Sequence, residues 1–249
     1  MEKLTSRKNE YIRRLRALAS DREYRNEQGE FVCDGLKLLK EALCFGAAVT
    51  SALWKNGAEV LAGLESTAQY LAGSELFDYA SPMKNSPGPL FTVKIPAQDA
   101  GTPIKNAVVL ETVQDPGNVG TVIRTANAFG LGAVILTGEC ADLYNPKTVR
   151  STMGAIFRQR VLTVDAEGLE RLLERNSLPL YGAALHRDSA LLTAIDVKNA
   201  AVAVGSEGKG LSERLLSLCD KTLFIPMQPD SESLNAAVAA SVIMWEMAR

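Results

Sequence analysis

Short apolar runs alternate with amphipathic segments along most of the chain. From residue 107 onward the apolar runs are four or five residues long, and the segments between them space their apolar residues as helices do. The runs predict strands at 108–112, 133–136, 161–164, 180–183, 201–204 and 222–225. Strands that alternate with helices in this way are typical of a mostly parallel sheet in an α/β protein.

The first hundred residues carry a second and smaller alternation. Helices are predicted at 6–19, with Ser6 as the cap, from 35 to about 46, and at 75–80, and strands at 31–33, 49–54, 68–71 and 90–95. Residues 95–103 contain two prolines and one glycine, as a linker does. We therefore expect a small α/β domain at 1–96, a linker at 97–105 and the mostly parallel domain at 106–249.

Length and composition fit an ordinary soluble protein. The chain has 249 residues, of which 47% are hydrophobic and 22% charged. Its charged amino terminus lacks the apolar core of a signal peptide, and no apolar run approaches the roughly 20 residues of a membrane span. We expect a cytoplasmic protein with no membrane partner. Because the chain has one histidine and four widely spaced cysteines, we expect reduced thiols and neither a disulfide framework nor a metal site.

A glycine-rich loop follows the predicted strand 201–204. Gly205 to Gly210 reads GSEGKG, and three glycines in six residues let the backbone turn sharply and approach a ligand. This spacing matches neither the dinucleotide fingerprint GxGxxG nor the P-loop GxxxxGK[ST], which argues against a nicotinamide-dependent dehydrogenase. The alternative is a strand-to-helix turn that binds nothing, with Ser212 capping the next helix.

A second polar loop follows the strand 222–225 and leads through Ser233 and Asn235 into an apolar final helix. In open α/β sheets ligands bind at the carboxyl ends of the strands. Both loops lie at such ends, so the sequence predicts a ligand site between them.

Positive charge is concentrated in two segments, although the net charge is only −2. Residues 1–16 hold six basic side chains against two acidic ones, and residues 147–160 hold four basic side chains and no acidic one. Such clusters neutralise the phosphates of nucleic acids, and the alternative is a solvated helix face.

Three segments carry a family resemblance: NVGTVIRTANAFG from Asn118, GSEGKGL from Gly205 and IPMQPDSESLN from Ile225. In this order and at these separations they resemble the motifs of the SpoU (TrmH) family of RNA ribose 2′-O-methyltransferases, in the SPOUT superfamily. The resemblance covers about the last 145 residues. The stretch NEQGEFVCDGLKLLKEAL resembles, more loosely, the RNA substrate-binding domain that many members carry at the amino terminus.

The resemblance implies S-adenosyl-L-methionine as cofactor, a trefoil knot in the carboxyl-terminal domain, a homodimer, and RNA as the partner. The residues that it implies for cofactor binding are Gly205, Ser206, Glu207, Gly208, Gly210, Ile225, Met227, Ser233 and Leu234. For RNA contact we assign the basic residues Arg7, Lys8, Arg13, Arg14, Lys147 and Arg150.

Arg124 is the catalytic candidate, because the family treats the corresponding arginines as catalytic. A guanidinium with a pKa above about 12 is an awkward general base, so we favour stabilisation of the developing alkoxide, with proton transfer as the alternative. We expect Glu207 to hold Arg124 in a bidentate pair. Asn118, Ser233 and Asn235 are hydrogen-bonding candidates around cofactor, ribose or phosphate, and helix capping is the alternative role for Ser233.

The function predicted from the sequence is methyl transfer from S-adenosylmethionine to a ribose 2′-hydroxyl of RNA. Ribosomal RNA is preferred over transfer RNA as the substrate. An RNA-binding protein that keeps the fold without catalysis is the alternative from another class.

Overall fold

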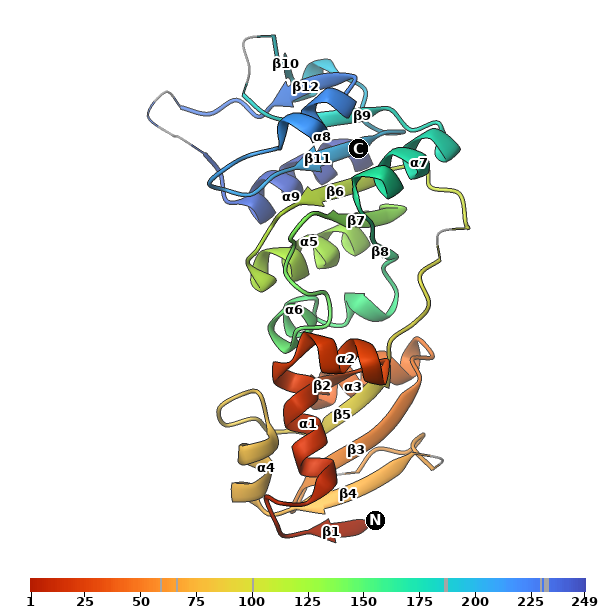
Figure 1. The fold of residues 1–249 in the computed structure, drawn as a ribbon, viewed down its shortest axis with the longest axis vertical. Coiled ribbons are helices and arrows are strands. Elements are labelled where there is room, and N and C mark those ends of the chain that lie inside the picture. The colour runs from red at the N-terminus through yellow and green to blue at the C-terminus, as the bar shows by residue number, and fades with distance from the viewer. Residues whose placement is uncertain (59, 66, 100, 186–187, 229, 231–232) are drawn as a thin grey trace. The chain divides into compact units, whose positions relative to one another are not determined.

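The computed structural model describes residues 1–249 except 59, 66, 100, 186–187, 229 and 231–232. The chain forms two compact units, each built on its own β-sheet (Figure 1). The first unit consists of Met1–Ala97 together with Asp142–Phe157, and the second of Gln98–Ala141 together with Arg158–Arg249. The segment Asp142–Phe157, which the sequence places inside 106–249, thus packs with the amino-terminal residues.

The first unit has a five-stranded sheet in the order β1-β4-β3-β5-β2, in which β5 is antiparallel to both of its neighbours. Its elements are β1 (Glu2–Leu4), α1 (Glu10–Ser20), α2 (Arg22–Gln28), β2 (Glu30–Asp34), α3 (Leu36–Cys44), β3 (Val49–Lys55), β4 (Ala68–Ala72), α4 (Ser74–Ala80), β5 (Leu90–Lys94), α6 (Pro146–Ser151) and the 3₁₀ helix η1 (Ala155–Phe157). The strands and helices predicted in residues 31–95 are confirmed to within about one or two residues, whereas β1 and α2 were not predicted.

Strand alternation separates two hydrophobic cores in this unit. Val32 and Leu53 face the apolar sides of α1 and α4, whereas their neighbours Phe31 and Trp54 face α3. Successive side chains of a strand point to opposite faces, so one sheet serves both cores. Helices therefore cover the sheet on both sides.

The first helix begins later than predicted. Asn9, not Ser6, is its cap, and the side-chain oxygen of Asn9 accepts a hydrogen bond from the Tyr11 amide at 2.9 Å. Ser6 instead accepts a bond from the Lys8 amide at 3.1 Å and forms the preceding turn. Both residue types cap helices well, and residues 6–9 form a turn in which the Asn9 amide donates to the Ser6 carbonyl oxygen at 3.1 Å.

A buried ion pair holds the segment Asp142–Phe157 to the first unit. Arg25 of α2 is only 3% exposed, and its Nε donates to Oδ2 of Asp142 at 3.0 Å, a bond that its Nη2 duplicates. Its Nη1 donates to the carbonyl oxygen of Leu18 at 2.6 Å. Val149 of the same segment is buried in the core on the α3 side. The segment thus completes the first unit.

The second unit has a seven-stranded sheet in the order β10-β12-β9-β11-β6-β7-β8, and all of its strand pairs are parallel. Its elements are β6 (Ala107–Glu111), α5 (Pro116–Phe129), β7 (Ala133–Thr137), β8 (Val161–Thr163), α7 (Ala166–Asn176), β9 (Leu180–Ala183), β10 (Ala190–Leu191), the 3₁₀ helix η2 (Leu192–Ala194), β11 (Ala201–Val204), α8 (Glu213–Leu218), β12 (Lys221–Phe224) and α9 (Ala236–Ala248). This confirms the predicted α/β class with a parallel sheet. The knot stays a prediction.

Helices cover both faces of this sheet. Leucines of α7 and α8 pack on one face, and α5 and α9 lie side by side on the other (Figure 1). The inner strands β7 and β11 are buried at every position, as parallel strands covered on both faces are. Within the described part of the chain no helix is long and apolar enough to cross a membrane.

The predicted linker is tied to the second unit. The side chain of Gln98 accepts a hydrogen bond from the Thr163 amide at 3.0 Å, and the carbonyl oxygen of Asp99 accepts one from Nε of Arg160 at 2.7 Å. The linker is therefore fixed along β8 from its second residue.

We predict that Asp142→Ala destabilises the first unit markedly. The substitution leaves the buried Arg25 without its carboxylate, and breaking a buried pair costs about 3–5 kcal/mol. Asp78→Ala is the control, because Asp78 pairs with Lys55 at 2.9 Å at the surface, where a pair contributes less than about 1 kcal/mol. Urea unfolding followed by circular dichroism measures the free energy of unfolding of both variants. If Asp142→Ala and Asp78→Ala lose the same stability, the packing of Asp142–Phe157 in the first unit is contradicted.

Candidate functional site

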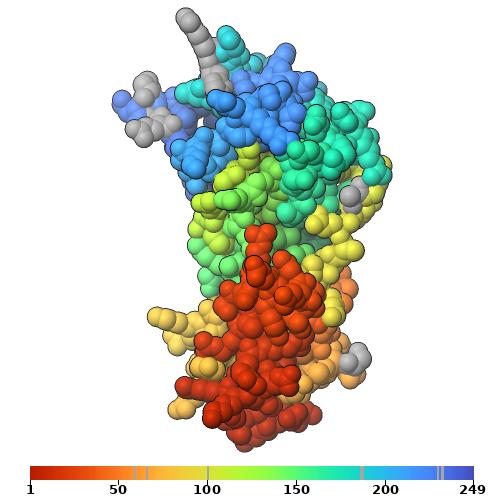
Figure 2. All heavy atoms as spheres, viewed as in Figure 1, coloured from red at the N-terminus to blue at the C-terminus, as the bar shows by residue number. Residues whose placement is uncertain are grey.

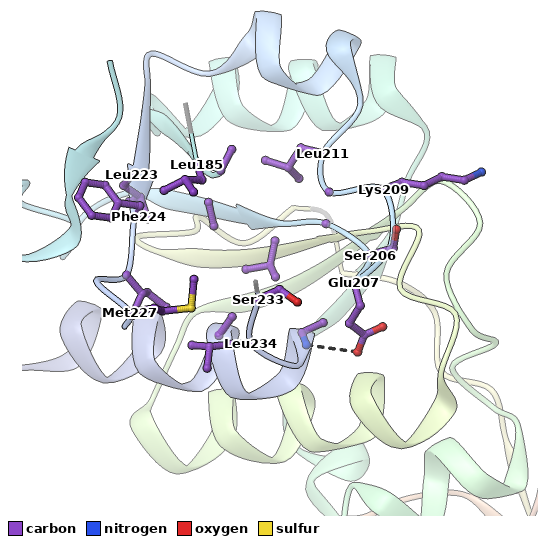
Figure 3. Close-up of a pocket in the computed structure, with 18 of the residues that line it drawn as sticks. Leu185, Ser206, Glu207, Lys209, Leu211, Leu223, Phe224, Met227, Ser233 and Leu234 are labelled. Carbon is purple, nitrogen blue, oxygen red and sulfur yellow. Dashed lines mark hydrogen bonds between the residues drawn. The ribbon is translucent and has the colours of Figure 1, made fainter. Parts of the chain in front are cut away.

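A pocket of about 380 Å³ opens at the carboxyl ends of β9, β11 and β12 in the second unit (Figure 3). Most of its lining residues come from the end of β9, the loop after β11, the end of β12 with the loop after it, and the start of α9, and Leu216 of α8 adds one more. The lining residues are Ala183, Ala184, Leu185, Val204, Gly205, Ser206, Glu207, Lys209, Gly210, Leu211, Leu216, Leu223, Phe224, Ile225, Met227, Ser233, Leu234, Ala236 and Ala239. Its volume is within the range of small-molecule sites.

The loop after β11 folds back on itself. The amide of Gly210 donates to the carbonyl oxygen of Ser206 at 2.9 Å, and Gly210 has a φ of +64°. A Cβ on Gly205 would lie 2.1 Å from the carbonyl carbon and oxygen of Gly210, so no side chain fits there. Glycine is required at Gly205 for the close approach of two backbone segments and favoured at Gly210 for its left-handed conformation.

Gly208 differs from the other two glycines. A Cβ at this position would meet nothing within 4 Å, and the residue does not line the pocket. Every other residue that the sequence assigned to cofactor binding does line it. The role of Gly208 in cofactor binding stays a prediction.

A hydrogen-bond network joins Glu207, which lines the pocket, to Asn118 and Asn235, which line a neighbouring groove. Oε1 of Glu207 accepts bonds from Nδ2 of Asn118 at 2.6 Å, from Nδ2 of Asn235 at 3.0 Å and from the Ala236 amide at 3.3 Å. Nδ2 of Asn235 also donates to Oδ1 of Asn118 at 3.2 Å. All three segments that carry the family resemblance thus meet at one carboxylate oxygen.

Asn235 also caps the final helix. Its Oδ1 accepts bonds from the amides of Ala237 at 3.0 Å and Val238 at 3.3 Å. The alternative role of Ser233 as a cap is therefore not observed, since α9 begins at Ala236. Ser233 lies in the pocket instead (Figure 3).

Arg124 lies outside this network. It is exposed on α5, and its side chain forms no hydrogen bond or ion pair with any other residue that the structure describes. The expected bidentate pair with Glu207 is not formed within the chain, and Oε1 of that carboxylate binds Asn118, Asn235 and the Ala236 amide instead. Six residues along a helix amount to about 240° of rotation, so Arg124 and Asn118 face different directions.

Apolar side chains form the rest of the pocket. Met227 and Leu234 lie near α9, Leu185 and Leu211 lie across the pocket from them, and the Lys209 side chain extends away from it (Figure 3). The end of β9 also lines the pocket, and this contribution was not predicted. The signal was present, since 180–183 was predicted as a strand, but the order β12-β9-β11 was needed to place its carboxyl end in the pocket.

Cysteine chemistry does not contribute to the site. Cys219 packs behind Leu211, near Gly182, and burial raises its pKa to about 11. Burial also raises the pKa of Cys140. Both thiols are protonated at neutral pH, whereas a cysteine nucleophile must be a thiolate. All four cysteines are free.

The residues assigned to RNA contact all fall in the first unit. Arg14 pairs with the buried Glu30, which Lys94 also contacts at 2.8 Å, so its charge is neutralised within the unit. The guanidinium of Arg7 lies over the Tyr79 ring, 4.7 Å from its centroid. The remaining side chains, Lys8, Arg13, Lys147 and Arg150, are exposed. In the space-filling view the amino-terminal residues, in red, form much of the visible face of this unit (Figure 2).

The fold that carries this pocket, a parallel α/β sheet covered by helices on both faces, matches solved structures of SpoU methyltransferases. Comparison with known proteins agrees: the model of the SpoU rRNA Methylase family matches residues 105–245, and the chain belongs to this family. The membership predicted from the three segments is confirmed.

Individual relatives match along the whole chain. The chain is 31% identical over 248 residues to the 23S rRNA (guanosine(2553)-2′-O)-methyltransferase RlmP of Bacillus subtilis (strain 168), with 99% of both chains covered. It is 30% identical to the 23S rRNA (uridine(2479)-2′-O)-methyltransferase of Streptomyces viridochromogenes, over 99% of this chain and 92% of that protein. The crystal structure of the SpoU methyltransferase AviRb from Streptomyces viridochromogenes in complex with the cofactor AdoMet has a TM-score of 0.86 and 28% identity, covering 97% of this chain and 98% of that one.

We predict that Gly205→Ala destabilises the second unit by more than about 2 kcal/mol, because the added methyl group overlaps backbone atoms that cannot move aside. Gly208→Ala is the matched control in the same loop, and its effect is expected within about 0.5 kcal/mol. Thermal unfolding of both variants checks this. A neutral Gly205→Ala would show that the loop does not fold back as described.

Proposed function

We propose that this protein transfers a methyl group from S-adenosylmethionine to a ribose 2′-hydroxyl of 23S ribosomal RNA. The observation that carries the proposal is the convergence of the three family segments on one pocket, with Glu207 joining them. Support comes from the two relatives matched over the full chain, both named for 2′-O-methylation of 23S rRNA. Transfer RNA remains the alternative substrate.

The pocket fits an adenosine derivative. Leu211, Met227 and Leu234 offer apolar surface to a purine, and the close contact between Gly205 and Gly210 leaves backbone rather than side chains at the wall of the pocket. When bound, S-adenosylmethionine supplies an electrophilic methyl group, so the protein has to position the ribose and stabilise its developing negative charge.

Different residues of the chain position the ribose and stabilise its developing charge. Glu207 fixes the carboxamides of Asn118 and Asn235 beside the pocket, and Ser233 adds a hydroxyl group within it. Arg124 supplies the cation that stabilises the alkoxide. Because Arg124 lies outside the lining of its own pocket, we place it at the pocket of a second copy of the chain.

The dimer that this requires uses α5 and α9. Val238 is 48% exposed, Val242 38% and Trp245 56%, so α9 presents an apolar strip to solvent. With Asn118, Thr121 and Ser241 these residues line a groove beside the network. An apolar helix face of this kind requires a partner, and a twofold axis would place the same face on both copies.

Capture of the RNA is assigned to the first unit. We propose 1–96 as the RNA-binding domain, 97–105 as the linker and 106–249 as the methyltransferase domain, with 142–157 serving the RNA-binding domain. The exposed cations Arg13 and Arg150 then belong to one compact unit although they are far apart in sequence.

Transfer of labelled methyl groups from S-adenosylmethionine to 23S rRNA transcripts, with tRNA transcripts in parallel, tests the function. We expect label in 23S rRNA and a 2′-O-methylnucleoside on mass mapping. Arg124→Ala should lower turnover by about 10²–10³-fold while cofactor affinity is kept, because the lost group acts on the transition state.

Arg171→Ala is the control for this variant, since Arg171 is an exposed arginine of the same unit. Label in tRNA alone would overturn the choice of substrate. Normal turnover by Arg124→Ala would remove Arg124 from the catalytic set.

We predict that Val242→Glu converts the dimer into monomers, because the substitution places a charge in an apolar interface, where it would be desolvated. Val60→Glu, at an exposed valine of the first unit, should leave the mass unchanged. Light scattering at micromolar concentration measures the mass of each variant and so distinguishes monomers from dimers. A wild-type protein that is monomeric and active would contradict the dimer.

A further inference from the structure

Glu111, at the carboxyl end of β6, binds one residue of another segment with both of its carboxylate oxygens. Oε2 accepts a hydrogen bond from the Ser212 amide at 2.7 Å, and Oε1 accepts one from the Ser212 hydroxyl at 2.6 Å. Glu111 forms no ion pair with any cation that the structure describes. Its two acceptor oxygens are thus directed at Ser212 alone.

Ser212 is fixed from a second side. Its hydroxyl oxygen accepts a bond from the Leu215 amide at 3.1 Å, as the cap of α8. Since the hydroxyl hydrogen is donated to Glu111 and a lone pair faces α8, the side chain has one orientation. The Ser212 hydroxyl oxygen thus caps α8, while the Ser212 amide and hydroxyl hydrogen both bind Glu111.

The position of Ser212 determines the end of the glycine loop. Leu211 and Gly210, which line the pocket, directly precede it. The other end of the loop leaves β11, whose Val204 pairs with Leu110, the residue before Glu111. One end of β6 therefore holds both ends of the loop, through strand pairing on one side and through the carboxylate on the other.

We propose that Glu111 is a positioning residue for the cofactor pocket: its carboxylate holds Ser212 and so keeps the loop from Gly205 to Leu211 at the width that S-adenosylmethionine requires. Glu111 does not line the pocket and does not touch the reacting atoms. The inference rests on the proposed function in one respect, the identity of the ligand.

The test measures S-adenosylmethionine binding to the full-length protein by calorimetry. Glu111→Ala should weaken affinity about tenfold, the size expected from the loss of hydrogen bonds to a charged group. The affinity of Glu111→Gln should lie between those of the wild type and Glu111→Ala, because the glutamine amide can still accept a hydrogen bond from the Ser212 amide and donate one to the Ser212 hydroxyl. Glu213→Gln is the matched control, since it removes the same charge two residues from the cofactor loop at an exposed site.

A kinetic measurement separates positioning from general loosening. Glu111→Ala should raise KM for S-adenosylmethionine and leave turnover at saturating cofactor within about threefold of the wild type. In the Glu111→Ala background, Ser212→Ala should weaken binding less than it does in the wild type, because the two residues share one interaction. Glu111→Gln keeps the side-chain shape and provides the test if Glu111→Ala does not fold.

The outcomes distinguish the two proposals. If the wild type binds no S-adenosylmethionine, the proposed function fails, and the inference with it. If the wild type binds it and both Glu111 variants bind it as tightly as Glu213→Gln does, only the inference is overturned. A drop in turnover without a change in KM would also overturn it.

Discussion

One carboxylate oxygen joins the parts of the site that the chain supplies from distant positions. Oε1 of Glu207 accepts bonds from the side chains of Asn118 and Asn235 and from the amide that opens α9. Without this acceptor, two carboxamides would lose a charged partner, and the start of α9 would lose an anion at its positive end. The arrangement of α5, the glycine loop and α9 around the pocket depends on it.

The fold was predictable where short apolar runs carried the signal. In the second unit six strands were placed to within about one or two residues, because a parallel strand covered on both faces reads as an uninterrupted apolar run. The two-residue strand β10 and the polar helix α2 gave no such signal. At α1 both Ser6 and Asn9 were good cap candidates, and the local sequence could not show that Asn9 is the cap.

The sequence predicted which residues form the site, but not which of them hydrogen-bond to one another. The resemblance to the SpoU motifs identified Gly205, Glu207 and Asn235. Which groups Glu207 binds depended on the angular positions of Asn118 and Arg124 around α5. The contribution of β9 required the strand order. The role of Arg25 was invisible for another reason: its partner Asp142 is 117 residues away and carries no motif.

The first unit is built from two separate segments of the chain, and this affects whether it can be transferred to another protein. Its core includes Val149, and its buried arginine is neutralised by Asp142, so both come from a stretch encoded within the methyltransferase half. A gene fusion that moved only residues 1–97 to another enzyme would transfer a module with part of its interior missing. A transplanted amino-terminal half would therefore need a segment equivalent to Asp142–Phe157 from its new partner to complete its core.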